Sequence, residues 1–156
     1  MTKKLAILFA ILNFSCTCRG VPKGFFLMSP DQQKAEFEKY DFETQYKIYI
    51  CSQQNVEPPA LELATVFAAE GGTIVKPLES KLEETDNDRT IRDIVFVFSE
   101  MCRQATHQVS MDKSLMDELR NKTSSVRDPA VREITEETFQ LIRTECKPEK
   151  PLGGSR

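Results

Sequence analysis

Asp88-Arg-Thr-Ile-Arg-Asp-Ile94 and Asp128-Pro-Ala-Val-Arg-Glu-Ile134 are two versions of one stretch, and this stretch decides the fold. They align when the chain is shifted against itself by about forty residues, so that Asp88 meets Asp128 and Arg92 meets Arg132. Each begins with an Asp, a residue type that caps helices, and Pro129 suits the first helical position of the second. A period of about forty residues with one helix pair per unit predicts a helical-repeat fold.

Apolar residues recur at helical spacing through most of the remaining chain, between recognisable start and stop signals. Ser29-Pro30-Asp31 supplies a cap, a helix-opening proline and an acid, and Gly71-Gly72 supplies a left-handed stop. In the last helix we expect one inward face made of Val131, Ile134, Thr138, Leu141 and Ile142. The pattern predicts helices over 30–39, 43–53, 59–70, 73–84, 89–105, about 115–124 and 129–146.

The motif Asp128-Pro-Ala-Val-Arg132 resembles the opening of the second helix in HEAT repeats, which commonly reads Asp-Pro-x-Val-Arg. Residues 88–94 keep the Asp and Arg but lack the Pro. The resemblance covers about two repeats over residues 60–146. It implies an all-α, short, right-handed stack of about six helices, in which the Asp caps its helix and the Arg bonds neighbouring turns. It implies no catalytic residue. An irregular helical bundle is the alternative.

The N-terminus has the pattern of a secretory signal peptide over residues 1–17. Lys3 and Lys4 precede an apolar stretch, Leu5 to Phe14, which is about half the roughly 20 residues that a membrane-spanning helix needs. The segment also resembles a lipoprotein leader, with Cys16 or Cys18 as the lipidated residue. A retained membrane anchor is the other alternative. We then expect a linker over 18–29, one helical domain over 30–147 and a disordered tail over 148–156.

The cysteines of the domain, Cys51, Cys102 and Cys146, are too widely spaced for a redox pair or a zinc site. In an oxidising compartment they are candidates for disulfides, with Cys18 as a fourth, and four cysteines allow three pairings. If the repeat alignment holds, Cys102 corresponds to position 142, one turn from Cys146. This equivalence predicts a Cys102–Cys146 disulfide. Buried free thiols are the alternative.

No cluster in the sequence has the spacing of a catalytic or metal site. His107 lies five residues after Cys102 with no acid placed to orient it, so we expect an exposed His without a catalytic role. The acids around Asp86 lack the spacing of a calcium loop and are expected to be solvated. A hydrolase would need paired carboxylates, for example Asp86 with Glu100 or Glu118. We expect no cofactor.

The formal net charge of −3 becomes −5 without Lys3 and Lys4, and no basic cluster offsets it, which argues against nucleic acid as a partner. We expect a monomeric, non-catalytic protein, exported to the periplasm or cell envelope or secreted, that binds another protein through a HEAT-like surface. A membrane would be contacted only through a lipid anchor. A periplasmic immunity or inhibitor protein is one alternative, and a small hydrolase is another. A concave face with Tyr46, Tyr49, Arg92 or Arg132 would favour binding.

Overall fold

The structure, a computed structural model, describes residues 18–146. The expected leader with Cys16 and the expected disordered tail lie outside these residues. Within the described range the chain forms seven α-helices and three short 3-10 helices and contains no strand, so the all-α prediction is confirmed. The helices are α1 (Pro30–Phe37), α2 (Phe42–Asn55), α3 (Glu62–Ala69), α4 (Val75–Glu84), α5 (Asp88–Arg103), α6 (Lys113–Ser125) and α7 (Pro129–Glu145). Seven is the number of helical ranges that the sequence pattern predicts, against about six for the stack that the resemblance implies.

Most helices begin where a side chain satisfies their first free N–H groups. Ser29 forms a capping box with Gln32 at the start of α1. The other side-chain caps are Asp41 for α2, Asn87 for α5, Asp112 for α6 and Asp128 for α7. The helix predicted over 59–70 begins only at Glu62, so the prolines before it lie in the α2–α3 loop and do not open the helix.

The turn between α3 and α4 depends on one glycine. Gly71 has a φ of +60°, as predicted for a left-handed stop, and a Cβ at this position would lie 2.8 Å from the backbone oxygen of Thr106. After it, Gly71–Ile74 forms a 3-10 helix, and α4 starts at Val75 rather than at 73. The glycine therefore brings the α3–α4 turn against the end of α5, because no larger residue fits there.

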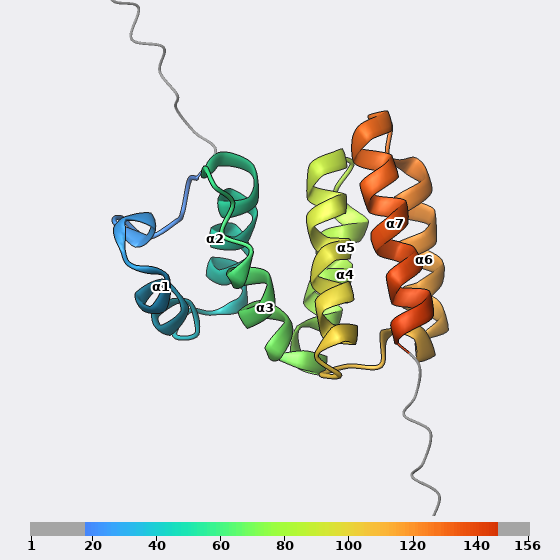
Figure 1. The fold of residues 1–156 in the computed structure, drawn as a ribbon, viewed down its shortest axis with the longest axis horizontal. Helices are drawn as coiled ribbons and strands as arrows, with labels where there is room; N and C mark the ends of the chain where they lie inside the picture. The colour runs from blue at the N-terminus through green and yellow to red at the C-terminus, as the bar shows by residue number, and fades with distance from the viewer. Residues whose placement is uncertain (1–17, 147–156) are drawn as a thin grey trace, which may run out of the picture.

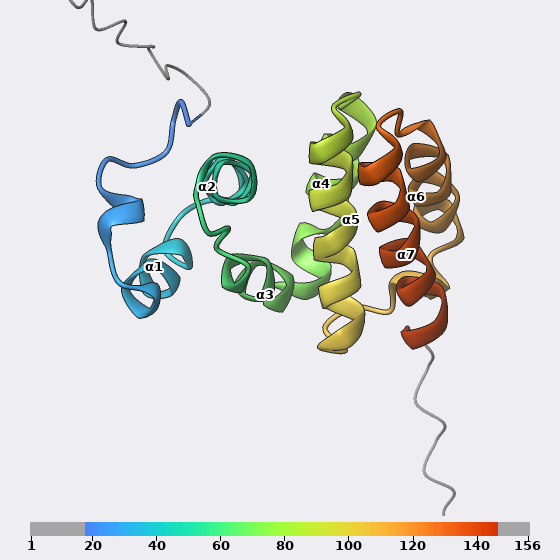
Figure 2. The ribbon, with the colours of Figure 1, turned by 45° about the horizontal axis from the view of Figure 1, so that its top comes forward.

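Two helical hairpins, α4/α5 and α6/α7, lie side by side (Figure 1), with α5 packed along α7 and α4 against α6. The short helices α1, α2 and α3 form the other part of the molecule, and α3 packs on α5 (Figure 2). Residues 88–94 and 128–134 thus open corresponding helices of the two hairpins. This arrangement agrees with a helical stack.

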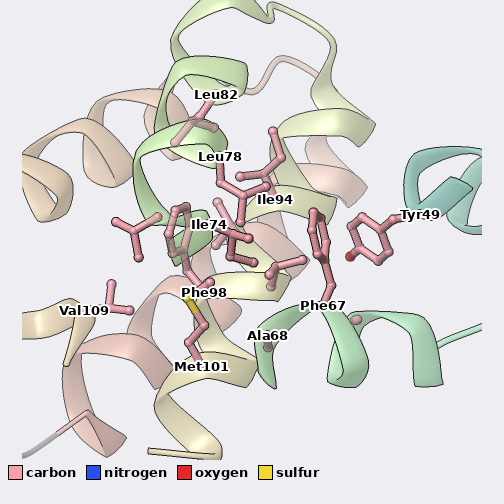
Figure 3. Close-up of a cluster of buried hydrophobic side chains, with 14 of the residues drawn as sticks. Tyr49, Phe67, Ala68, Ile74, Leu78, Leu82, Ile94, Phe98, Met101 and Val109 are labelled. Atoms are coloured by element: carbon pink, nitrogen blue, oxygen red, sulfur yellow. The ribbon is translucent and has the colours of Figure 1, made fainter. Parts of the chain in front are cut away.

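The two parts of the molecule share one hydrophobic core, seen in Figure 3. Phe67 on α3 lies at its centre, with its ring centroid 5.7 Å from those of Phe37 and Phe42 and 5.8 Å from that of Tyr49. The same cluster continues into α4, α5 and α7 through side chains that include Leu78, Ile94, Phe98 and Ile142. Aromatic contacts therefore attach α1 and α2 to α3, which in turn packs on α5.

Two disulfides tie the described chain together. Cys102 on α5 pairs with Cys146 at the end of α7, with Cα atoms 4.8 Å apart, which confirms the predicted pairing. Cys18 pairs with Cys51 on α2, with Cα atoms 5.3 Å apart. The Cys18 sulfur is therefore engaged in a disulfide, which does not agree with the alternative of a lipid attached at Cys18.

The segment predicted as a linker, residues 18–29, is packed on the fold. The disulfide to Cys51 fixes its start, and Phe25 in the 3-10 helix Phe25–Leu27 is buried. Only part of the segment is exposed, most clearly Leu27. Among residues 18–146, no helix is both long and apolar enough to cross a membrane.

Candidate functional site

A groove of about 590 Å³ runs between the α2–α3 loop, α5 and α7. One wall is the end of α2 with the loop that follows it, and the other is the N-terminal half of α7, with α5 between them. The lining combines apolar and charged side chains, a composition typical of binding sites. Its residues are Gln53, Gln54, Glu57, Pro59, Leu61, Arg89, Arg92, Asp93, Phe96, Asp128, Ala130, Val131, Ile134 and Thr138.

The polar base of the groove is a hydrogen-bond network between α2 and α5. Asp93, which is buried, accepts at Oδ1 from Nε and Nη2 of Arg92, at 2.8 and 2.6 Å. Its Oδ2 accepts from Nε2 of Gln54 at 2.9 Å, and its backbone oxygen accepts from the Tyr49 hydroxyl at 2.8 Å. Burial raises the pKa of Asp93 above its usual range, because the donors from Gln54 and Arg92 only partly offset the lost solvation. The network fixes the α2 wall against α5.

Apolar side chains stand exposed on both walls of the groove. Leu61, just before α3, is 56% exposed, and Ile134 on α7 is 50% exposed. Phe96 and Val131 lie half-buried between them. Farther along α7, Leu141 is 47% exposed. The expectation that Ile134 and Leu141 face inward is therefore wrong.

The core face of α7 consists of Thr135, Thr138, Phe139 and Ile142, so Thr138 and Ile142 face inward as predicted. The two threonines are accommodated because their hydroxyls donate to the carbonyls of Val131 and Ile134, four residues earlier. Of the two larger apolar residues that face outward, Ile134 lines the groove and Leu141 does not. The sequence pattern alone favours an inward position for both, since Ile and Leu are the more apolar residues.

The outer face of α7 is polar. A shallow depression there is lined by Pro129, Arg132, Glu133, Glu136, Glu137 and Gln140. A terminal unit of a helical stack needs such a face to remain soluble. The contrast between this face and the apolar groove shows that the exposed Ile134 is not part of a generally apolar helix.

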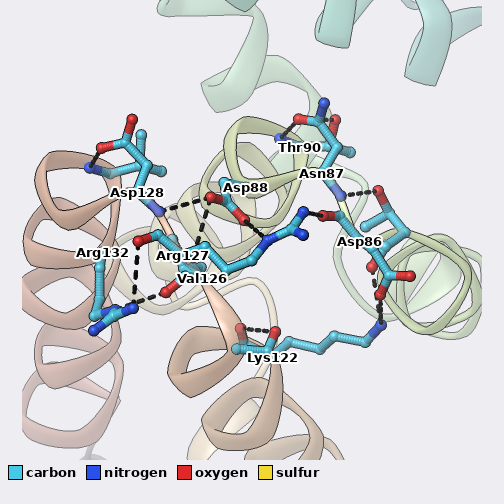
Figure 4. Close-up of polar contacts among 12 residues, drawn as sticks. Asp86, Asn87, Asp88, Thr90, Lys122, Val126, Arg127, Asp128 and Arg132 are labelled. Atoms are coloured by element: carbon cyan, nitrogen blue, oxygen red, sulfur yellow. Dashed lines mark hydrogen bonds and ion pairs between the residues drawn. The ribbon is translucent and has the colours of Figure 1, made fainter.

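Asp88, Asp128 and Arg132 of the repeat motif lie where the α4–α5 turn meets the α6–α7 turn, shown in Figure 4. Asp88 was expected to cap α5, but Asn87 does so, accepting from the backbone N–H of Thr90. Asp88 is free to reach the other hairpin because Asn87 takes over the cap. Its Oδ2 accepts from the backbone N–H groups of Arg127 and Asp128, at 3.1 and 2.8 Å.

Asp128, Pro129 and Arg132 occupy the predicted positions at the start of α7. Asp128 caps the helix by accepting from the backbone N–H groups of Ala130 and Val131, and Pro129 is its first residue. Arg132 donates from Nε to the backbone oxygen of Val126 at 2.6 Å. Its counterpart in the repeat alignment, Arg92, pairs instead with its neighbour Asp93. Of the two arginines, only Arg92 lines the groove.

The tyrosines expected on a concave face lie elsewhere. Tyr49 is buried, and burial holds its pKa well above the usual range. Tyr46 stacks on Phe42 and lies under the ammonium group of Lys81, 5.5 Å from the ring centroid. Of the four residues expected on a concave face, only Arg92 lines the groove.

The structure does not bring together Asp86 and Glu100, one of the carboxylate pairs considered for a hydrolase. Asp86 precedes α5 and Glu100 lies in its last turn, about 20 Å farther along the helix axis. The charged partner of Asp86 is Lys122, at 3.9 Å, and Glu100 accepts from Thr65 and Arg103. Within residues 18–146, no group of three or more His, Cys, Asp and Glu is placed to hold a metal ion.

His107 is half-buried rather than exposed, because the loop that carries it folds against Gly72. Its Nε2 has no hydrogen-bond partner among the described residues. The Cys102 sulfur is held in a disulfide, so it cannot serve as a nucleophile beside this ring.

Comparison with known proteins gives no match to a family model, to a curated protein or to a solved structure. Sequence reasoning found Arg92 as a groove residue, placed Asp128 only as a helix cap, and missed Gln54, Leu61 and Ile134. The proline pair before Leu61 was a usable signal, because it places an apolar residue in a loop. No local signal marks Gln54, whose role depends on a partner on another helix.

Proposed function

We propose that this is a non-catalytic, exported protein that binds another protein through the groove between the α2–α3 loop, α5 and α7. The observation that carries the proposal is the exposure of Leu61 and Ile134 on the two walls, 56% and 50%, next to a polar outer face on α7. Exposed apolar side chains are common singly, but a groove that gathers several of them is typical of an interaction site.

The apolar part of the groove can supply useful binding energy. Fully burying a Leu or Ile contributes about 1.5–3 kcal/mol, so covering the exposed halves of Leu61 and Ile134 would contribute about 1 kcal/mol each. Phe96 and Val131, already half-buried between them, would add contact area without new ordering of long side chains. A partner that covers the whole groove would therefore be held mainly by these four apolar side chains.

The groove walls are held in place before a partner arrives. Gln54 and Asp93 connect α2 to α5, and the Cys102–Cys146 disulfide connects α5 to α7. Because little ordering remains to be done on binding, more of the contact energy becomes affinity. These fixed walls support the proposal that the exposed apolar side chains of the groove bind a partner.

Export is supported by the two disulfides together with the leader-like N-terminus. Disulfides persist in oxidising compartments and are rare in the cytosol of most organisms. We place the protein in the periplasm, at the cell envelope or outside the cell. We also propose that α4/α5 and α6/α7 are two HEAT-like units, since their corresponding helices pack side by side.

The test is affinity capture with the disulfide-bonded protein as bait, from the medium and cell envelope of the producing organism. We expect a stoichiometric partner that is lost with Ile134→Asp or Leu61→Asp. Gln140→Asp is the matched control, because it puts the same charge on the polar outer face of α7. A partner retained by both groove variants, or no stoichiometric partner at all, would overturn the proposal.

A further inference from the structure

We propose that Asn121 on α6 carries an N-linked glycan, attached during export before α6 packs into the fold. Asn121-Lys-Thr123 is an Asn-x-Ser/Thr acceptor sequence, in which the middle residue is not proline. The other such sequence, Asn13-Phe-Ser15, lies in the predicted leader. The proposal rests on export, by a route in which the chain meets a lipid-linked oligosaccharide, and it does not depend on the groove.

The side chain of Asn121 is exposed and free to carry a modification. Its amide forms no hydrogen bond among residues 18–146, unlike the side chains of Arg120 and Ser124, which bond within α6. Because each residue of a helix is rotated by about 100° from the one before, Asn121 lies almost opposite the buried Leu119 and Thr123. A bulky group on this amide therefore extends away from the core.

The hydroxyl of Thr123 has no use in the folded structure. Thr123 is 3% exposed, and its Oγ1 is buried without a hydrogen-bond partner among the described residues. Thr135 and Thr138 on α7, in contrast, donate to carbonyls four residues earlier. A valine would fill the position of Thr123 without burying an unpaired hydroxyl. The acceptor sequence gives this hydroxyl a function, since recognition requires it.

The helix separates the two side chains that the acceptor sequence must present together. In an extended chain, residues two positions apart point to the same side, so Asn121 and Thr123 would lie next to each other. In α6 they point in nearly opposite directions, one to solvent and one into the core. A transferase that recognises both cannot use the folded protein, and attachment must precede the packing of α6.

The transfer uses the lipid-linked oligosaccharide as its co-reactant. Nδ2 of Asn121 attacks C1 of the first sugar, and the bond from C1 to the pyrophosphate oxygen breaks. The lipid pyrophosphate leaves with the electron pair, and the nitrogen gives up one proton to a base. Nothing is oxidised or reduced in this step.

The attachment point lies away from the groove. In both views α6 is at the outer side of the α6/α7 hairpin, and α1, α2 and α3 lie at the opposite side of the molecule (Figure 1, Figure 2). No residue of α6 lines the groove. A glycan on Asn121 is therefore compatible with the proposed binding role.

The first measurement uses the native protein, purified from the producing organism. We expect the peptide that contains Asn121 to carry a glycan. Peptide N-glycosidase should release it and convert Asn121 to Asp, which the mass of the peptide records. A native protein with Asn121 unmodified would overturn the inference. It would leave the groove unaffected, because affinity capture tests the groove separately.

Translation of the full chain, leader included, into endoplasmic reticulum microsomes tests recognition. We expect the wild type and Thr123→Ser to be glycosylated, and Asn121→Gln and Thr123→Val to lose the glycan completely. Thr135→Val is the matched control, because it removes a buried threonine hydroxyl outside the acceptor sequence and should keep the glycan. A glycan retained by Thr123→Val, or lost from Thr135→Val, would overturn the inference.

Protein made without a glycan and folded with both disulfides tests the order of events. Offered to the same microsomes opened with detergent, it should gain no glycan, whereas the reduced and alkylated chain should gain one. In denaturation, Thr123→Val should have a midpoint no lower than that of the wild type, because the lost hydroxyl has no partner. Equal glycosylation of the folded and unfolded chains, or a lower midpoint for Thr123→Val, would overturn the inference.

Discussion

The backbone N–H of Asp128 donates to Oδ2 of Asp88 at 2.8 Å, so the residue that opens α5 binds the residue that caps α7. The two residues are equivalent in the forty-residue alignment, yet one caps its own helix and the other reaches across to the next hairpin. The neighbouring Arg127 N–H donates to the same oxygen. One carboxylate thus sets the register between the two hairpins.

Replacing Asp88 by Ala should lower the free energy of unfolding by about 1–3 kcal/mol, because two backbone N–H groups lose their acceptor. Chemical denaturation would measure the change. Asp86→Ala is the control, since that side chain is 99% exposed, and should change stability by less than about 0.5 kcal/mol. Equal effects of the two variants would contradict the role of Asp88.

Removing the Cys102–Cys146 disulfide with the double variant Cys102→Ala/Cys146→Ala should lower stability by about 4 kcal/mol, since the bond closes a sequence separation of 44 residues. Denaturation of the variant and of the wild type, both without reductant, would test this. Mass spectrometry of a non-reduced digest is an independent measurement. Separate free-thiol peptides containing Cys102 and Cys146 would show that the bond is not formed.

Tyr49→Phe should lower the free energy of unfolding by about 0.5–1.5 kcal/mol, because the buried hydroxyl donates to the backbone oxygen of Asp93. The rest of the ring, and so the packing against Phe67, is unchanged. Tyr46→Phe is the matched control, because no described residue forms a hydrogen bond with the Tyr46 hydroxyl, and it should leave stability nearly unchanged. A larger loss for Tyr46→Phe would show that the α2–α5 contact is assigned to the wrong tyrosine.

The buried carboxyl of Asp93 should make stability depend on pH in an identifiable direction. Burial raises its pKa above the ordinary 3.8 in the folded protein, so the folded state holds this proton more tightly than the unfolded state. Relative to Asp93→Asn, the free energy of unfolding of the wild type should therefore fall as pH rises from 3.8 through the raised pKa, and then level off.

Denaturation of the wild type and of Asp93→Asn at matched pH values would give this difference. The other acids, including Glu100, whose pKa the Arg103 hydrogen bond lowers, cancel because both proteins contain them. NMR titration of the Asp93 carboxyl carbon would report its pKa directly. A difference that rises with pH would show that the pairing with Arg92 outweighs burial.

The helices themselves could be predicted from the sequence because their signals are local. The Asp128-Pro129 start, the Ser29 cap and the Gly71 stop each depend on residues within one or two turns, and all three are where the pattern places them. The Cys102–Cys146 pairing also followed, because the forty-residue period relates positions on two helices. The repeat supplied long-range information that local propensities lack.

Tertiary structure decided the groove. Gln54 becomes a site residue only because α2 ends beside Asp93. Asp88, which leaves the cap of α5 to Asn87, instead accepts from the N–H groups of Arg127 and Asp128 in the neighbouring hairpin. Likewise Ile134 faces outward because buried threonines of α7 satisfy their hydroxyls on their own helix. Each outcome depends on which of several possible contacts is more stable once the helices are packed together. A sequence pattern shows which residues could make a contact but not which contact forms.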